Sequence, residues 1–285
     1  MVLREIALRE LRESFRNYWF WVNAGVFLAG GLLLILFGQV DVTVLGFRGV
    51  ARSLAGLMQL ALFIVPLMAL FPSAASLAGE REVGTLDYLL AQPVDRGEVY
   101  TGKWLGVATA VVLSLAAGFL VVGGVAVGRG MPALLLAELA GLAALLALAF
   151  VSLGMWISAS TSTQGRATSL GLTLWLAFLA LGSLGLMGGF VAWGVPPAVL
   201  EAWAFLDPVE AFRMAMITLL DPALEMLGPV GADLADRLGP GPLVAASLGS
   251  LAAWTAGAWW AGLRTFTRPV RTAGRPDRPA PDRGA

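Results

Sequence analysis

The sequence predicts an all-α integral membrane protein with six transmembrane helices, an amino-terminal amphipathic helix and short helices on both sides of the membrane. Hydrophobic residues make up 58% of the 285 residues and charged residues only 13%. An average globular chain has roughly 45–50% apolar and about 25% charged residues. A water-soluble fold of this size cannot enclose so much apolar surface and still keep a charged exterior.

The second observation is a set of long windows that contain no Asp, Glu, Lys or Arg. Each is at least as long as the roughly 20 apolar residues that a spanning helix needs. The windows are apolar on every side and do not alternate every second residue, so they resemble neither half-buried soluble helices nor strands of a membrane barrel. We expect spans at about residues 18–38, 54–77, 104–127, 134–158, 168–194 and 242–263.

Basic residues predict the orientation. With the amino terminus inside, most of the 19 Lys and Arg residues fall in inner segments, as the positive-inside rule requires. We expect a multi-pass protein of a bacterial inner (plasma) membrane with both termini cytoplasmic. Residues 1–268 would form a single transmembrane domain, and the Pro- and Arg-rich residues 269–285 a disordered cytoplasmic tail.

The composition excludes several kinds of chemistry. The chain has no Cys and no His, which zinc, haem, thiolate and Ser-His sites require. A net charge of zero points away from nucleic acid as a partner. Methionine thioethers favour Cu(I), but Met is also ordinary core filler. We therefore expect no catalytic residue, no metal ligand and no cofactor bound by this chain.

Residues 2–16 predict an amphipathic helix in the inner membrane interface. Apolar residues step by four along one face, and opposite charges stand four apart. The alternative is a helical extension that is simply solvated. The expected interfacial contacts are Leu3, Leu11 and Phe15.

The inner loop 78–103 predicts a short helix. Thr85, which follows Gly84, is a plausible N-cap, and Pro93 ends the helix near Gln92. Three leucines share its apolar face: Leu86, Leu89 and Leu90. Such a helix at a membrane surface suits docking into the groove of a partner. It could equally pack against the spans of its own chain, and the composition favours neither.

The same loop contains a false phosphate-binding pattern. Gly97, Gly102 and Lys103 match Gly-x-x-x-x-Gly-Lys, but Trp104 follows where a phosphate loop needs Ser or Thr for magnesium. If ATP drives this protein, another chain binds it.

Outside the membrane, residues 197–239 predict interfacial helices broken by prolines. Pro208 after Asp207 is a sound helix start. Within the spans no charged residue lies at a helix centre, which argues against a proton-coupled carrier. Glu138, near the outer end of the fourth span, is either functional or turned toward the outer water. Without Cys, His or a central carboxylate pair, an intramembrane enzyme is also disfavoured.

The pattern Glu80-Arg-Glu-x-Gly-Thr-Leu-x-x-Leu-Leu-x-x-Pro-x-x-Arg-Gly-Glu98, followed by Gly102-Lys103, resembles the cytoplasmic signature of ABC transporter permeases of the type-two exporter class. The six-span layout agrees with that class. The resemblance implies that residues 85–92 form the coupling helix, seated in the groove of a cytoplasmic ABC ATPase that binds ATP and Mg. The implied coupling residues are Glu80, Glu82, Gly84, Thr85, Leu86, Leu89, Leu90, Pro93 and Arg96.

Within this class the chain is most similar to the permease of the nitrous oxide reductase maturation system. The similarity rests on Gly46-Phe47, residues 54–70 with Pro66, residues 207–213 and residues 231–234. It implies a homodimer of this chain in the lipid bilayer, with two copies of the cytoplasmic ATPase. It also implies a periplasmic copper-binding β-helix protein seated on the outer helices. The outer contacts would be Asp207, Pro208, Phe212 and Arg213.

One departure bears on this subfamily, because Asp207 stands where the family usually has Asn. The alternative within the class is an exporter of drugs, lipids or peptides without an outer partner.

Overall fold

The computed structural model describes residues 2–37, 49–193, 197–220, 237 and 239–268. Within these ranges every regular element is a helix, which confirms the predicted all-α class. The elements are α1 (Val2–Arg16), α2 (Tyr18–Phe37), α3 (Gly49–Val83), α4 (Thr85–Leu90), α5 (Arg96–Gly128), α6 (Ala133–Ser160), α7 (Gln164–Trp193), α8 (Pro197–Leu206), α9 (Pro208–Leu220) and α11 (Pro240–Thr267).

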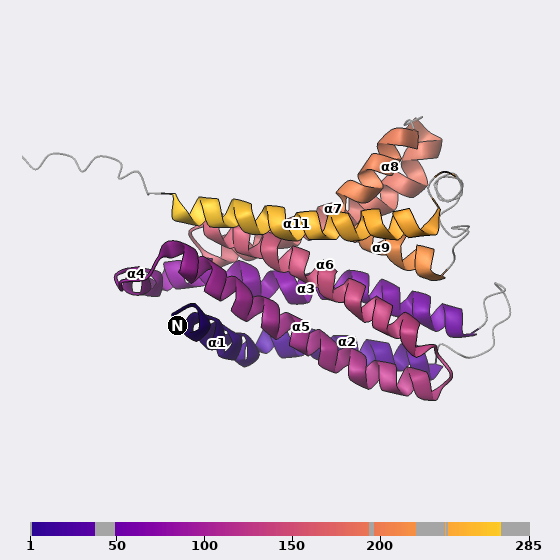
Figure 1. Ribbon diagram of the computed structural model, residues 1–285, viewed down its shortest axis with the longest axis horizontal. Helices are drawn as coiled ribbons and strands as arrows, with labels where there is room; N and C mark the ends of the chain where they lie inside the picture. Colours follow the sequence, from indigo (N-terminus) through magenta and orange to yellow (C-terminus); the bar gives the residue numbers. More distant parts are fainter. Residues whose placement is uncertain (1, 38–48, 194–196, 221–236, 238, 269–285) are drawn as a thin grey trace, which may run out of the picture.

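The long helices lie side by side in an elongated bundle (Figure 1). Helices α1 and α4 lie at one end, and the carboxyl end of α11 reaches the same end. The first and last described helical residues therefore share one end of the bundle, as the predicted topology requires. Which side of the membrane this end faces stays a prediction.

Five helices are long and apolar enough to cross a membrane, and they match five of the six predicted windows. They are Phe20–Phe37, Ser53–Val83, Arg96–Gly128, Ala133–Ser160 and Gln164–Gly182. The sixth window forms α11, which carries several Trp, Gly and Ser residues and is not among the five. The count of six spans therefore stays a prediction.

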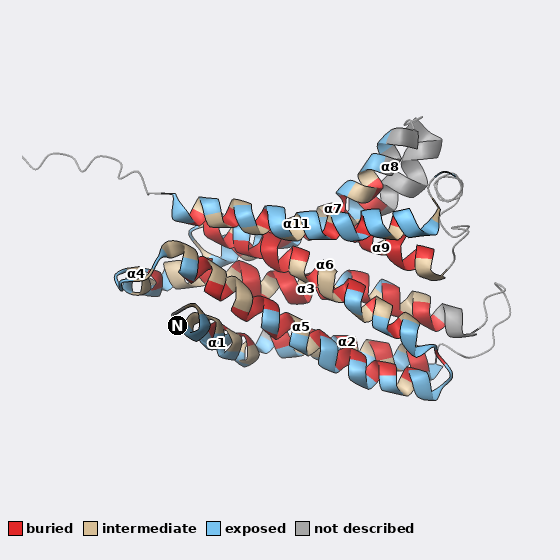
Figure 2. Ribbon diagram, in the orientation of Figure 1, coloured by how far each residue is buried: buried red, intermediate tan, exposed pale blue. Residues whose placement is uncertain are grey.

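Helix α6 is the centre of the bundle. It packs most extensively against α11 and α3, and it also contacts α5, α7 and α9. Figure 2 shows buried residues along α6 and along the sides of α3 and α5 that face it. At Gly154 the backbone of α6 lies directly against Ser73 of α3, so a larger residue at 154 would collide with that hydroxyl. Such close approach through small residues is how helices associate in membranes.

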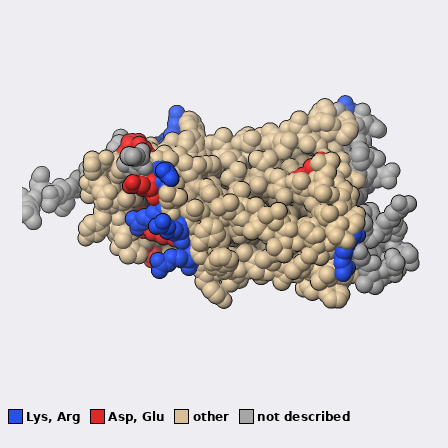
Figure 3. Space-filling model, turned by 60° about the horizontal axis from the view of Figure 1, so that its bottom comes forward, with Lys and Arg blue, Asp and Glu red and all other residues tan. Residues whose placement is uncertain are grey.

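Charged side chains gather toward the two ends of the molecule (Figure 3). The surface between them is almost entirely uncharged in this view. A charged residue at the centre of a bilayer is costly, so this band is the region that fits the hydrocarbon core. The end that carries α1 and α4 holds the larger share of the charge in this view.

Candidate functional site

A buried lysine joins three helices at the end of the bundle where α1 and α4 lie. Lys103 of α5 is 2% exposed. Its Nζ forms an ion pair with Oε2 of Glu10 in α1 and lies 3.2 Å from Oε1 of Glu80 in α3. Ser76 Oγ donates a hydrogen bond of 2.5 Å to the other oxygen of Glu10. Burying an ammonium group is expensive unless it is paired, and here two carboxylates pair with it.

Two of these carboxylates and Glu13 lie close enough together to resemble a metal site. Oxygens of Glu10, Glu13 and Glu80 lie within 4.8 Å of one another. However, Lys103 already supplies a cation to two of them, and Arg9 Nε lies 2.9 Å from Glu13 Oε1. The cluster is therefore an ion-pair network whose positive charge comes from the chain itself.

Two glycines of α5 bring α1 close enough for this pairing. A Cβ at Gly106 would lie 2.5 Å from Cβ of Glu10 and 2.6 Å from the carbonyl oxygen of Ala7. A Cβ at Gly102 would lie 2.9 Å from Cγ2 of Ile6. Real Cβ atoms do not approach so closely. Only glycine, which has no side chain, lets α1 rest directly on the backbone of α5.

The residues that follow Glu80 join α3 to the turn between α6 and α7. The Arg81 guanidinium donates to the carbonyl oxygens of Thr161 and of Ser158, the latter at 3.4 Å, at the carboxyl end of α6. Glu82 Oε2 accepts a hydrogen bond of 2.9 Å from the backbone N–H of Gln164, the first residue of α7. A cation at a helix carboxyl end and an anion at an amino end both complement the helix dipole.

The start of α4 corrects one prediction. Gly84, and not Thr85, is the N-cap, with a left-handed φ of 80°. This conformation suits glycine because L side chains rarely adopt it. Thr85 is instead the first helical residue, and its hydroxyl donates to the carbonyl oxygen of Glu80 at 3.2 Å. The helix ends at Leu90 rather than Gln92, since the residue before Pro93 is driven out of the helical region.

The leucines of α4 face the protein. Leu86 is 3% exposed, and Leu89 and Leu90 are half-buried against the hydrophobic core. The sequence left packing against the chain's own helices open as an alternative, and for Leu86 that alternative is correct. The outward surface consists of other residues, above all Tyr88 at 80% and Val83 at 77% exposure.

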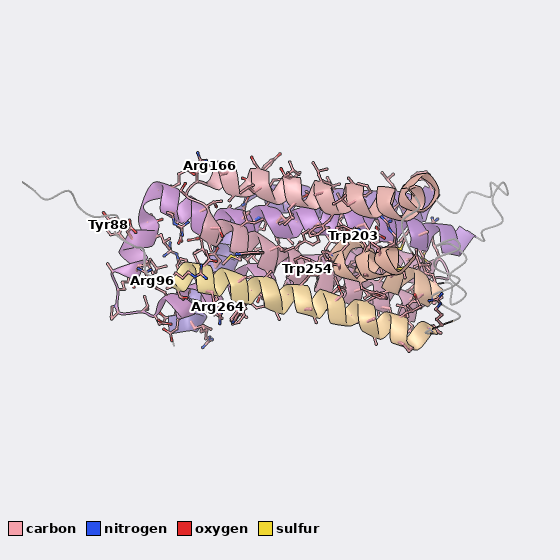
Figure 4. All side chains as sticks on the ribbon, turned by 90° about the horizontal axis from the view of Figure 1, so that it is seen from above. Tyr88, Arg96, Arg166, Trp203, Trp254 and Arg264 are labelled. Atoms are coloured by element: carbon pink, nitrogen blue, oxygen red, sulfur yellow. The ribbon has the colours of Figure 1, made fainter. Side chains whose placement is uncertain are left out.

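Sequence reasoning missed Tyr88, although a signal was present. Two residues along a helix correspond to a rotation of about 200°, so Tyr88 had to point away from Leu86. Figure 4 places Tyr88 at the tip of the bundle, at the end where Arg96, Arg166 and Arg264 also lie. Pro93 is exposed and Arg96, the first residue of α5, is half-buried.

At the opposite half of the molecule, Asp207 separates α8 from α9 and caps α9. Its Oδ1 accepts a hydrogen bond of 2.8 Å from the N–H of Val209, which confirms the predicted helix start. Asp207 is fully buried, and burial raises its pKa to about 7, with the neighbouring Glu210 acting in the same direction. Glu210 is also fully buried, and Arg213 Nη1 lies 2.8 Å from its Oε1.

Helices α8 and α9 are held against the middle of α11. Trp254 Nε1 donates to the carbonyl oxygen of Leu206 at 2.7 Å, and Ser250 Oγ donates to that of Phe205. Figure 4 shows Trp203 and Trp254 well away from the end that carries Tyr88.

The predicted outer contacts lie inside the chain. Asp207, Pro208 and Phe212 are buried against its own helices, and only Arg213 is partly exposed. Contact with a partner thus stays a prediction, and Asp207 and Phe212 could take part only after α8 and α9 have moved. Residues 46–47 and 231–234, which supported the subfamily resemblance, lie outside the described residues.

A bundle that contains five helices long and apolar enough to cross a membrane, with charged residues toward its ends, is the architecture of a multi-pass membrane protein. Residues 4–269 match the model of the ABC-2 family transporter protein, and the chain therefore belongs to this family. It is the membrane permease subunit of an ABC transporter.

Two relatives carry the name "Probable ABC transporter permease protein NosY". The protein from Pseudomonas aeruginosa is 30% identical over 273 residues, which covers 92% of this chain and 94% of the relative. The protein from Stutzerimonas stutzeri is 28% identical over 241 residues, which covers 80% and 87% respectively. The predicted resemblance to the ABC permease class is thereby confirmed.

Proposed function

We propose that this chain couples ATP hydrolysis in a separate cytoplasmic ABC ATPase to the movement of its own transmembrane helices. Membership of the ABC-2 family supports this role, because a permease of an ABC transporter acts with an ATP-binding subunit. ATP and Mg are bound by the partner, and this chain contributes no catalytic residue.

The observation that carries the proposal is how residues 80–85, where α3 ends and α4 begins, are held in place; we call this segment the α3–α4 corner. Helix α4 projects from the end of α3 with Val83 and Tyr88 exposed. Directly behind it, Glu80, Arg81 and Glu82 bond to α5, α6 and α7 in turn. A push on α4 therefore reaches most of the bundle through direct contacts.

We assign α4 as the coupling helix. Its exposed Tyr88 supplies a large amphipathic anchor of the kind that fills partner grooves. The predicted coupling residues take two roles in this proposal. Thr85, Pro93 and the half-buried Leu89 and Leu90 border the docking face. The others shape and brace the corner: Glu80, Glu82, Gly84, Leu86 and Arg96.

The topology in this proposal has six spans, with α11 as the sixth and both termini cytoplasmic in a bacterial inner membrane. Residues 1–268 form the permease domain and residues 269–285 the cytoplasmic tail. Helix α1 lies in the inner interface, where Leu11 and Phe15 pack toward the core and Leu3 is half-buried.

The resemblance to NosY proteins supports a narrower role in maturation of the copper site of nitrous oxide reductase. In this role two copies of the chain act with two ATPases and a periplasmic copper-binding β-helix protein. The alternative is an exporter of drugs, lipids or peptides without an outer partner. The burial of Asp207 and Phe212 favours this alternative, because neither side chain is free to meet an outer protein.

The test is purification of the tagged chain from native membranes in mild detergent, followed by mass spectrometry of the proteins that co-purify. An ABC ATPase together with an extracytoplasmic β-helix protein would support the maturation role. An ATPase alone would keep the coupling role and favour the exporter. If no ATPase co-purified under conditions that preserve known ABC complexes, the proposed function would be wrong.

A further inference from the structure

The ion-pair network connects α4 to the amino-terminal helix by a short route. Glu80 lies five positions before Thr85, the first residue of α4, and its carbonyl oxygen holds the Thr85 hydroxyl. The side chain of Glu80 meets Lys103 of α5, and Lys103 also meets Glu10 of α1. The end of α3 is therefore connected to α1 through two consecutive ion pairs, Glu80–Lys103 and Lys103–Glu10.

The link resists separation because its groups are buried. The side chain of Lys103 is 2% exposed, that of Glu10 8% and that of Glu80 15%. Moving one partner away would leave the others charged, largely buried and unpaired. The three side chains therefore stay together through any motion that keeps the region closed.

The backbone contact adds a fixed register. Because Gly102 and Gly106 let the helices touch directly, α1 cannot slide along α5 without meeting the side chains on either side of the glycines. A single residue, Asn17, separates α1 from α2. The Trp21 indole N–H of α2 donates to the carbonyl oxygen of Phe15 in α1 at 2.6 Å, so α2 is fastened to α1 across this joint.

We infer that Glu10 and Lys103 are positioning residues that make α1 follow α4, so that docking at α4 also moves α2. The inference rests on the proposed function and adds a defined route to it. Helix α1 then adds a second connection to α2, which also packs directly against α3 and α5 but has no strong contact with α4.

The experiment measures the movement of α1 by double electron–electron resonance. The chain has no cysteine, so spin labels attach only at introduced thiols. Leu8→Cys labels an exposed site on α1, and Leu134→Cys labels an exposed reference site at the start of α6. The distance is recorded for the chain with its co-purified ABC ATPase, with and without ATP and magnesium.

The test variant is Glu10→Gln, and the matched control is Glu13→Gln. Both make the same chemical change on α1, but Glu10 contacts α5 whereas Glu13 pairs with Arg9 on its own helix. We expect the nucleotide-dependent shift in distance to disappear in Glu10→Gln and to persist in Glu13→Gln. ATPase affinity should stay within about threefold of the parent in both variants, because the docking face is untouched.

Three results would overturn the inference. A shift that persists in Glu10→Gln would show that the ion pair transmits nothing. A shift lost in both variants would point to a general effect of charge on α1. Loss of ATPase binding in Glu10→Gln would mean that Glu10 shapes the docking surface itself. If the parent chain bound no ATPase, the proposed function would fail as well, which is a distinct outcome.

Discussion

Lys103 shows at the scale of a single residue how this chain tolerates charge inside an apolar protein. It is the only lysine in the sequence and is almost inaccessible to solvent. Its two carboxylate partners come from helices that are distant in sequence, and Glu10 is 93 residues away. The two ion pairs offset the free-energy cost of burying the ammonium group only when α1, α3 and α5 are packed together.

The first prediction concerns this lysine. Lys103→Met leaves Glu10 and Glu80 buried without their cation, and we expect a loss of about 3–5 kcal/mol in stability. Thermal unfolding of the purified protein in detergent measures it. The triple variant Lys103→Met, Glu10→Gln, Glu80→Gln removes the unpaired charges and should recover most of the loss. Equal stability of the single variant and the parent would contradict the ion-pair assignment.

The second prediction concerns the glycine contact. Gly106→Ala places a methyl group against Glu10 and the Ala7 carbonyl, and we expect it to destabilise the protein by about 1–3 kcal/mol by forcing α1 away from α5. Gly124→Ala is the matched control on the same helix, where a Cβ meets nothing within 4 Å. That control should be neutral or stabilising because alanine favours helix. Similar melting temperatures for the two variants would refute close packing at Gly106.

Helix α4 illustrates how far local signals go at the scale of an element. The existence and position of the helix, the stop before Pro93 and the Asp207 cap of α9 followed from neighbouring residues alone. The cap at Gly84 did not, because it depends on a left-handed backbone conformation that sequence pattern does not specify. The pairing of Glu10 with Lys103 was also out of reach, because it depends on how distant helices pack.

The third prediction separates the two faces of α4. Tyr88→Asp changes an exposed side chain, so the protein should insert and fold normally but lose ATPase affinity by at least about tenfold. Ser162→Asp adds the same charge at an exposed site in the α6–α7 turn and should have little effect. Binding assays with the purified ATPase make the comparison. Equal losses in both variants would attribute the effect to charge rather than to the docking face.

At the scale of the whole molecule, the uncharged band between two charged ends is what the composition predicted. Of the six spans that the sequence predicted, the structure bears out five as long apolar helices. The sequence did not predict that residues of the α3–α4 corner form ion pairs and hydrogen bonds with α5, α6 and α7. Three consecutive residues, 80–82, point to three different helices, and only the assembled bundle gives each its partner.

The fourth prediction concerns orientation in the membrane. A single thiol introduced at Ser162 should react with a membrane-impermeant maleimide only from the cytoplasmic side, and one at Pro132, in the turn between α5 and α6, only from the outside. Both positions are exposed, and the natural chain has no competing cysteine. Right-side-out and inverted vesicles provide the two sides. The reverse pattern of labelling would contradict the proposed topology and place α4 outside the cytoplasm.

The most direct measurement is photo-crosslinking from position 88 in native membranes. A benzoylphenylalanine residue in place of Tyr88 keeps an aromatic side chain at the exposed tip of α4. Our account predicts an ultraviolet-dependent adduct with an ABC ATPase, identified by mass spectrometry, and no such adduct from the buried position of Leu86. If position 88 formed adducts only with lipid or with proteins that bind no ATP, α4 would not be the coupling helix and the central claim would fall.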